Sequence, residues 1–196
     1  ITVVGWAGDG GTVDIGLQAL SGAVDRNTDI LYVMYDNEAY MNTGIQCSGS
    51  TPCGAWTTTT PGGRNVKQRQ GKKRILEMMI ANGIVFGATV SVAYPDDFIR
   101  TIRKAKDIKG PRFIHAYTPC PSGWRMDPRK AIEVSRLAVR TGAFPLYEYH
   151  NGKYKFTKEI KKRKPVEEYL RLQGRFRHLT PADVAEVQAL VDREYK

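Results

Sequence analysis

Apolar runs of strand length alternate with segments of helical periodicity along most of this chain. The apolar runs are residues 1–7, 30–35, 84–92 and 112–117, and the helical segments are residues 13–24, 74–81, 96–106 and 128–140. This alternation is typical of βαβ units. It predicts an α/β fold built on a mostly parallel sheet with helices on both faces.

The last quarter of the chain departs from that alternation. Residues 146–149 and 154–156 predict a hairpin at an edge of the sheet, because Asn151-Gly152 between them readily adopts the positive φ of a tight turn. The basic residues 158–164 should be solvated.

Two further helices are predicted near the carboxyl terminus, over residues 165–172 and 181–195, each with a proline at or near its first turn. We divide the chain accordingly. Residues 1–157 form the principal domain, and residues 158–196 form a helical extension that packs on the same domain or on a partner subunit.

Composition narrows the class of protein. Of the 196 residues, 41% are hydrophobic and 26% are charged, which is close to ordinary globular usage and argues against disorder. No apolar run is long enough to span a membrane and no secretory signal is visible, so we expect a cytoplasmic protein. The chain opens on a strand without an initiator Met, and we expect an upstream segment to be missing.

The formal net charge of +10 raises the alternative of a basic nucleic-acid-binding module. The positive residues gather in 69–74, 100–109 and 158–164, but these clusters lack interleaved aromatic residues and match no nucleic-acid-binding motif. Solvated helix faces explain them better.

Two polar segments follow predicted strands that end at the same edge of the sheet, where open α/β sheets bind ligands. They are Gly8-Asp9-Gly10, after the first strand, and Asp36-Asn37-Glu38-Ala39, after the second. The glycines allow close backbone approach, and a helix starting near Thr12 would direct free N–H groups at a diphosphate. A long Gly/Thr/Ser-rich loop, residues 42–63, is expected to cover or line this site.

Asp9 would repel phosphate oxygens unless a cation lies between them. Magnesium prefers oxygen ligands and often joins a few protein oxygens to phosphates. The Asp9 carboxylate, the Asn37 side-chain carbonyl and the Ala39 backbone carbonyl could supply those oxygens. A dinucleotide fingerprint fits less well, because Val13 occupies its third glycine position, and an ordinary glycine turn remains the simpler alternative.

Several motifs together resemble the catalytic (beta) subunit of pyruvate-type 2-oxoacid:ferredoxin oxidoreductases. Gly8-Asp9-Gly10 followed by Asn37, after intervening positions 11–36, resembles the thiamine-diphosphate signature. The loop from Tyr40 to Trp56, with Asn42-Thr43-Gly44, resembles the corresponding loop of that family. Pro119-Cys120-Pro121 and residues 165–179 extend the resemblance nearly to the end of the chain.

The resemblance implies a thiamine-diphosphate-binding fold in residues 1–157 and a set of residue roles. It assigns Asp9, Asn37 and the Ala39 carbonyl to Mg²⁺. It assigns the surroundings of the cofactor to Gly8, Gly10, Gly11 and Thr43, and the thiazolium and substrate side to Asn42. Asn42 is the candidate catalytic residue, because a neutral amide can donate a hydrogen bond to a substrate oxygen; a turn-stabilising role is the alternative.

The same resemblance makes Cys120 one ligand of a 4Fe-4S cluster, whose other three cysteines would lie upstream of residue 1. Cys47 and Cys53 do not match ligand positions, so this chain alone should hold no stable cluster. Glu38 should not be the glutamate that activates the cofactor, which the family places in the pyrimidine domain of a partner subunit.

The implied activity is oxidative decarboxylation of pyruvate to acetyl-CoA and CO₂, or its reverse. Electrons would pass through iron–sulfur clusters to ferredoxin, and the partners would be the other subunits, ferredoxin, coenzyme A and pyruvate. A branched-chain 2-oxoacid:ferredoxin oxidoreductase subunit is the near alternative, and a non-redox thiamine-dependent decarboxylase is a weaker one. His115, His150 and His178 show no catalytic or metal-ligand spacing, and Trp56 and Trp124 are expected to pack.

Overall fold

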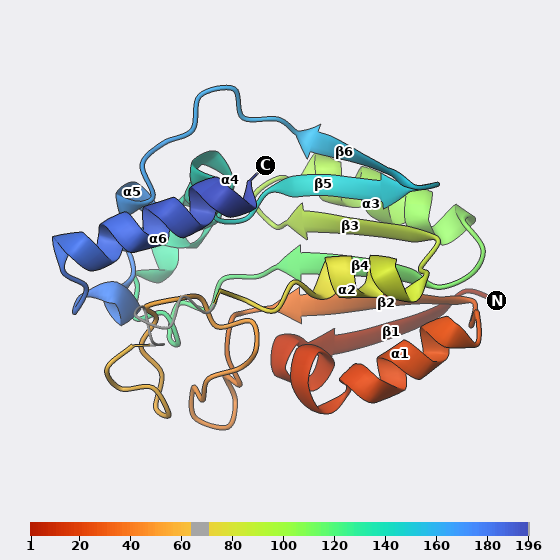
Figure 1. The fold of residues 1–196 in the computed structure, drawn as a ribbon, viewed down its shortest axis with the longest axis horizontal. Helices are drawn as coiled ribbons and strands as arrows, with labels where there is room; N and C mark the ends of the chain where they lie inside the picture. The colour runs from red at the N-terminus through yellow and green to blue at the C-terminus, as the bar shows by residue number, and fades with distance from the viewer. Residues whose placement is uncertain (64–70, 196) are drawn as a thin grey trace.

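The computed structural model describes residues 1–63 and 71–195. These residues form one six-stranded sheet with the order β1-β2-β4-β3-β5-β6 (Figure 1). The strands are β1 (Val3–Gly8), β2 (Ile30–Asp36), β3 (Phe86–Ser91), β4 (Arg112–Tyr117), β5 (Leu146–His150) and β6 (Lys153–Lys158). The first four strands are mutually parallel, whereas β5 and β6 run antiparallel to their neighbours. The prediction of a mostly parallel α/β sheet is confirmed.

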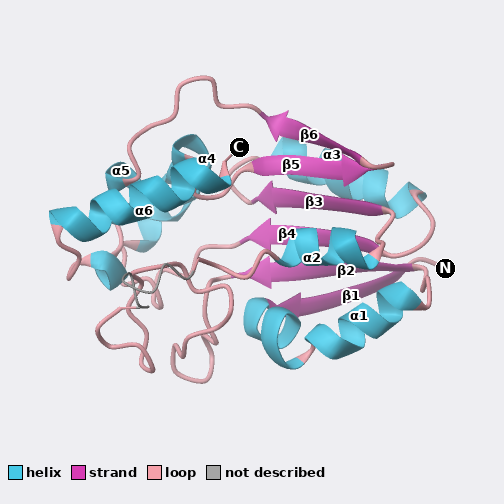
Figure 2. Cartoon of the chain, viewed as in Figure 1, coloured by secondary structure: helices cyan, strands magenta, loops and turns pink. Residues whose placement is uncertain are grey.

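Helices cover both faces of this sheet (Figure 2). They are η1 (Gly11–Ile15), α1 (Leu17–Asp25), α2 (Ile75–Asn82), α3 (Pro95–Asp107), η3 (Pro128–Lys130), α4 (Ala131–Thr141), α5 (Glu167–Leu170), η4 (Gly174–Phe176) and α6 (Pro181–Glu194). Leu20 of α1 and Leu76 of α2 share one apolar cluster with Phe113 of β4. On the opposite face, Ala105 of α3 packs against Ile114. Strands β3 and β4 are buried along their whole length because layers lie on both sides.

Local chemistry explains where several of these elements end. Helix α2 stops at Gly83, whose φ of 103° is easy for glycine alone. Thr180 and Asp183 form a reciprocal capping box at the start of α6. Between β5 and β6, Asn151 and Gly152 have φ values of 52° and 76°, as the predicted hairpin turn requires.

Two predicted helices differ in detail from the observed ones. The helix expected over residues 165–172 is the single turn α5, since the Gln173 side chain donates to the Tyr169 carbonyl at 2.8 Å and replaces a further turn. The helix expected near Thr12 begins as the π-helical segment η1 before α1 takes over. A π-type turn of this kind is frequent at functional sites.

The carboxyl-terminal segment packs on the carboxyl end of the sheet. Val166 and Tyr169 near α5, and Val187 of α6, share one apolar cluster with Trp124 and Val134. The carboxyl-terminal segment therefore lies beyond the carboxyl ends of the parallel strands, where α5 and α6 are seen in Figure 1.

The basic clusters are largely engaged in ion pairs. Lys104 pairs with Glu148, and Lys109 and Arg112 both pair with Asp29. Part of the first cluster, residues 69 and 70, lies outside the described residues. No helix in the described ranges combines the length and apolar character needed to cross a bilayer.

Candidate functional site

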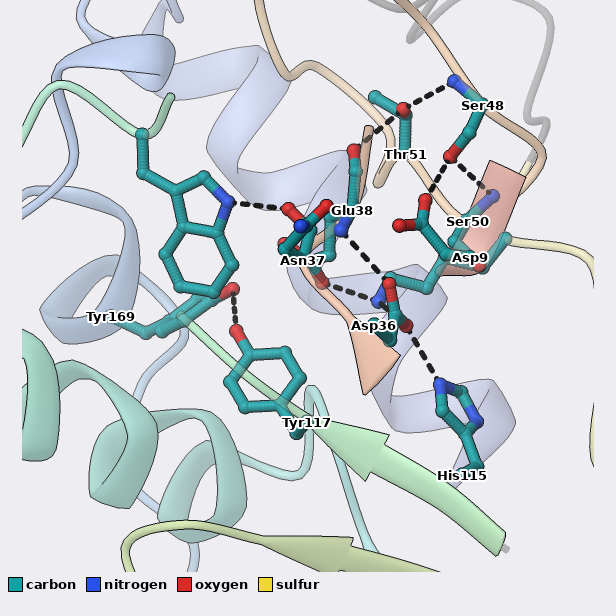
Figure 3. A network of polar contacts seen from close by, with 12 residues as sticks. Asp9, Asp36, Asn37, Glu38, Ser48, Ser50, Thr51, His115, Tyr117 and Tyr169 are labelled. Carbon is teal, nitrogen blue, oxygen red and sulfur yellow. Dashed lines mark hydrogen bonds and ion pairs between the residues drawn. The ribbon is translucent and has the colours of Figure 1, made fainter. Parts of the chain in front are cut away.

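The register of β1 and β2 brings the two predicted metal-binding segments together. Gly8, the last residue of β1, is paired with Tyr35 in the parallel ladder. Asp9 and Asn37 therefore leave the sheet side by side at its carboxyl edge. Figure 3 shows the two side chains facing each other.

Oxygen atoms from three predicted ligands converge at this point. The terminal amide atom of Asn37 lies 2.8 Å from the Ala39 carbonyl oxygen and 3.0 Å from Asp9 Oδ1. With nitrogen in that place, the amide donates to both oxygens; with oxygen in that place, three oxygens face one another and require a cation. Neighbouring oxygens around Mg²⁺, with bonds of about 2.1 Å, lie about 3 Å apart. The donor set and its spacing therefore fit magnesium.

A pocket of about 290 Å³ opens on these oxygens. Its lining residues are residues 8–11, Tyr35, Asn37 and residues 39–43. Every residue that the sequence assigned to the cofactor or to Mg²⁺ lines this pocket.

The glycines of the first turn leave its backbone open. A Cβ on Gly10 would lie 2.3 Å from the Tyr40 ring, whereas one on Gly11 would meet nothing among the described residues within 4 Å. Tyr40 closes over the turn and donates through its hydroxyl to the Gly10 carbonyl at 3.0 Å. The residue type at position 10 thus allows the two walls of the pocket to approach each other.

Asp9 is 1% exposed and lies in a negative field. Burial, followed by the charge of Asp36, raises the pKa of Asp9 to about 8, against the lowering effect of a 2.5 Å hydrogen bond from Ser48 Oγ. A bound divalent cation would favour the ionised carboxylate, so the electrostatics as well as the geometry suit a metal ligand.

The pKa of Asp36, the residue directly before Asn37, is shifted in the opposite direction. Burial acts to raise its pKa, but the Lys72 ammonium and the His115 ring outweigh burial and lower the pKa to about 2. Lys72 Nζ lies 3.1 Å from Asp36 Oδ2, and His115 Nε2 lies 2.7 Å from the same oxygen. Asp36 is thus a permanent carboxylate that holds the end of β2.

Glu38 belongs to the same buried network. Its carboxylate forms ion pairs with Lys72 and Arg175, and its N–H donates to Asp36 Oδ1 at 2.9 Å. That Glu38 does not activate the cofactor stays a prediction.

Three features of this network were not predicted from the sequence: Lys72, Arg175 and the contact of His115 with Asp36. Lys72 and Arg175 stand far from Glu38 in the sequence and carry no motif of their own. Trp124, expected only to pack, is fully buried and also donates from Nε1 to the Asn37 carbonyl at 2.8 Å. One feature of the sequence could have indicated them. Asp36 and Glu38 place two acids at the end of a buried strand, and buried acids need positively charged partners.

Asn42 and Thr43 lie on an exposed turn at the pocket. The Thr43 hydroxyl is directed within the turn, to Gln46 Oε1 at 2.5 Å and the Tyr40 carbonyl at 3.4 Å. Asn42 is exposed and lines the same pocket.

Cys120 does not line the pocket, whereas Met41 does. The Cys120 Sγ accepts a hydrogen bond from the Gly123 N–H at 3.4 Å, and a Cβ on Gly123 would lie 2.3 Å from Met41 Sδ and 3.4 Å from Cys120 Sγ. Met41 and Cys120 thus both lie close to Gly123. None of the three cysteines is in a disulfide, and the described residues contain no group of three His, Cys, Asp or Glu side chains able to hold a metal.

A larger hollow of about 340 Å³ lies elsewhere, between β6 and the end of α6. It is lined by Tyr154, Phe156 and Tyr195 among others and contains none of the predicted site residues. Of these two pockets, the smaller one is therefore the one that contains the predicted site residues.

A parallel sheet that carries a glycine turn and a magnesium-type oxygen set at its carboxyl edge defines a domain for a diphosphate cofactor. Residues 1–116 match the family model described as thiamine pyrophosphate enzyme, C-terminal TPP binding domain. The chain is 57% identical to the ketoisovalerate oxidoreductase subunit VorB of Pyrococcus horikoshii, with 100% of this chain and 64% of the relative covered. It is 53% identical to the pyruvate synthase subunit PorB of Methanocaldococcus jannaschii, covering 100% of this chain and 66% of that relative.

The chain belongs to the thiamine pyrophosphate enzyme family, among the 2-oxoacid oxidoreductase subunits that include PorB and VorB. A solved structure of the 2-oxoglutarate:ferredoxin oxidoreductase from Magnetococcus marinus, with 2-oxoglutarate, coenzyme A and succinyl-CoA bound, shares the fold. The TM-score is 0.55 at 20% identity, covering 79% of this chain and 56% of that one. The chain spans 64% of the length of the Pyrococcus horikoshii VorB relative.

Proposed function

We propose that this chain is the part of a 2-oxoacid:ferredoxin oxidoreductase that binds the diphosphate half of thiamine diphosphate through Mg²⁺. The observation that supports this most directly is the convergence of the Asp9 carboxylate, the Asn37 terminal amide and the Ala39 carbonyl in the pocket that residues 8–11 help to line. Residues 1–157 would form the cofactor domain, and residues 158–196 would buttress it.

Each residue then has a defined task. Asp9, Asn37 and the Ala39 carbonyl hold the cation, while the backbone at Gly8, Gly10 and Gly11 approaches the diphosphate. Thiamine diphosphate supplies the carbon nucleophile and the electron sink for decarboxylation of a 2-oxoacid. Asn42 donates its amide N–H to the substrate oxygen, which stabilises developing negative charge without adding a group that titrates.

The redox function of the whole enzyme would require further subunits. Cys120 would provide one thiolate of a 4Fe-4S cluster, with the remaining thiolates supplied from outside these residues. Exposed apolar side chains on β1 and η1 support a partner subunit: Val4 is 53% exposed, Trp6 61% and Ile15 85%. Ferredoxin would accept the electrons, coenzyme A would accept the acyl group, and the enzyme would work in the cytoplasm.

Pyruvate is the proposed substrate, in a reaction of the pyruvate synthase type, because the loop from Tyr40 to Trp56 and residues 165–179 resemble those of pyruvate-type subunits. Ketoisovalerate is the second candidate, since the chain is 57% identical to the VorB relative and 53% identical to the PorB relative. Steady-state kcat/KM for the two acids, measured on the same assembled enzyme, would separate them.

The decisive experiment is a calorimetric titration of thiamine diphosphate into the assembled complex, with Mg²⁺ and with chelator. Wild type, Asp9→Ala and Asn37→Ala should be compared, with Asn151→Ala on the distant hairpin turn as control. We expect Mg²⁺-dependent binding in wild type and in the control, and its loss in both site variants. Undiminished binding in Asp9→Ala and Asn37→Ala would refute the metal assignment.

A further inference from the structure

The metal-binding turn, residues 37–39, contains a backbone conformation that needs outside support. Glu38 has a φ of 69°, in the left-handed region that a residue with a Cβ adopts at a cost in free energy. The carbonyl of the next residue, Ala39, lies 2.8 Å from the terminal amide of Asn37, which also lies 3.0 Å from Asp9 Oδ1. The position of one proposed magnesium ligand thus depends on what holds Glu38.

Two hydrogen bonds hold the backbone of Glu38. Its N–H donates to Asp36 Oδ1 at 2.9 Å, and its carbonyl accepts from Thr51 Oγ1 at 2.7 Å. Its carboxylate is 2% exposed and lies against two cations, Lys72 and Arg175. Because Lys72 also serves Asp36, Arg175 is the cation dedicated to Glu38.

Arg175 is itself fixed on every side. It is 2% exposed, its guanidinium lies 4.1 Å from the centroid of the Trp124 ring, and its Nη2 donates to Gln173 Oε1 at 2.7 Å. The cation cannot move to solvent without leaving a buried carboxylate poorly compensated. Arg175 therefore anchors the Glu38 side chain from the far end of the chain.

Trp124 adds a second anchor to the same turn. While its ring supports Arg175, its Nε1 donates to the Asn37 carbonyl at 2.8 Å. Trp124 also lies in the loop of Cys120, and its backbone N–H donates to the Cys120 carbonyl at 2.9 Å. One residue thus joins the Arg175 anchor and the metal-binding turn, through its indole, to the cysteine loop, through its backbone.

We propose that Arg175, braced by Trp124, is a positioning residue that sets the conformation of residues 37–39 and thereby the divalent-cation affinity of the site. This inference rests on the proposed function. Residues that orient metal ligands from outside the coordination sphere change metal affinity by about 10- to 100-fold when they are removed. Arg175 and Trp124 hold the ligand-bearing turn in that way, from two directions.

The test measures the Mg²⁺ concentration that half-saturates thiamine diphosphate binding in the assembled complex. The variants are Arg175→Gln, Arg175→Lys and Trp124→Phe. Arg177→Gln is the matched control, since Arg177 lies in the same segment, is exposed, and has no side-chain ion pair among the described residues. Arg175→Gln should raise the half-saturating Mg²⁺ concentration about tenfold, and Arg175→Lys should restore part of the loss. Trp124→Phe keeps a ring, removes the N–H, and should produce a smaller rise.

Excess Mg²⁺ should return turnover of Arg175→Gln toward wild type, with the KM for the 2-oxoacid unchanged, which a general loss of folding would not do. If Arg175→Gln does not assemble, Arg175→Lys and Trp124→Phe decide the question. A wild-type Mg²⁺ requirement in the variants that assemble, or an equal shift in Arg177→Gln, would overturn the inference. Asp9→Ala keeps the two proposals distinct: loss of binding there with no effect at Arg175 and Trp124 refutes the positioning role alone.

Discussion

Asp14 Oδ2 accepts a hydrogen bond from the N–H of Gly49 at 2.9 Å, and this contact ties the start of the first helix to the long polar loop. The same carboxylate accepts from the Tyr40 hydroxyl at 3.2 Å and pairs with Lys73 Nζ at 2.6 Å. One side chain therefore links η1 to Tyr40, to the polar loop at Gly49 and to the segment before α2.

This contact makes a pH-dependent prediction. Although burial acts to raise the pKa of Asp14, the Lys73 and Gly49 hydrogen bonds hold it below its ordinary value of 3.8. The stability it contributes is present above that ordinary value and is lost as pH falls through the lowered one. Lys73→Met should reduce the free energy of unfolding by about 0.2–1 kcal/mol at pH 7. The difference from wild type should shrink below about pH 4.

Urea denaturation at a series of pH values measures this difference. In an Asp14→Asn background, Lys73→Met should cost the same at every pH. A pH dependence that survives in that background would assign the effect to another group.

Gly10 should tolerate no side chain. The added methyl of Gly10→Ala would lie 2.3 Å from the Tyr40 ring and displace it, at a cost of about 1–3 kcal/mol in unfolding free energy. Thermal denaturation of the chain checks this. Gly11→Ala, where the methyl meets no described atom within 4 Å, should melt near wild type; equal melting temperatures for the two variants would contradict the packing argument.

Thr51 should matter more than its small size suggests. Its hydroxyl donates to the Glu38 carbonyl at 2.7 Å and accepts from the Ser48 N–H at 2.9 Å, both buried. Thr51→Val keeps the shape of the side chain but removes both hydrogen bonds. The expected loss is about 1–3 kcal/mol in the free energy of unfolding. The exposed Thr58→Val is the control, and an equal loss in both would argue against a role for burial.

Cys120→Ser, made in the assembled enzyme, should reduce the electron paramagnetic resonance signal of the reduced cluster and slow electron transfer. Affinity for thiamine diphosphate should stay near wild type, because Cys120 does not line the pocket. Cys47→Ser should leave the cluster signal intact. An unchanged spectrum in Cys120→Ser would remove this residue from the cluster.

Much of the fold was predictable because its signals are local. β4 matches its predicted bounds, residues 112–117, and the hairpin turn at Asn151-Gly152 follows from the conformational preference of two residues. The order of strands was not predictable, since β3 lies beyond β4 and nothing local records that crossover.

The candidate site also combines local features, which the sequence predicts, with contacts between distant residues, which it does not. Asp9 and Asn37 were predictable because they follow neighbouring strands, and the structure brings them together. The positive φ of Glu38 and its ion pair with Arg175 depend on contacts between distant parts of the chain, which no local pattern encodes. The residues that hold the turn at Glu38 were therefore missed, although the predicted site residues all line one pocket.

The Asn151-Gly152 turn also has a practical use. Since His150 pairs with Phe86 at the beginning of β3, this turn lies at the end of the sheet opposite the pocket. Gly152 must keep its φ of 76°, but the next residue, Lys153, is exposed. A cysteine introduced at position 153 could carry a fluorophore or tether the enzyme to an electrode with the pocket facing away from the surface.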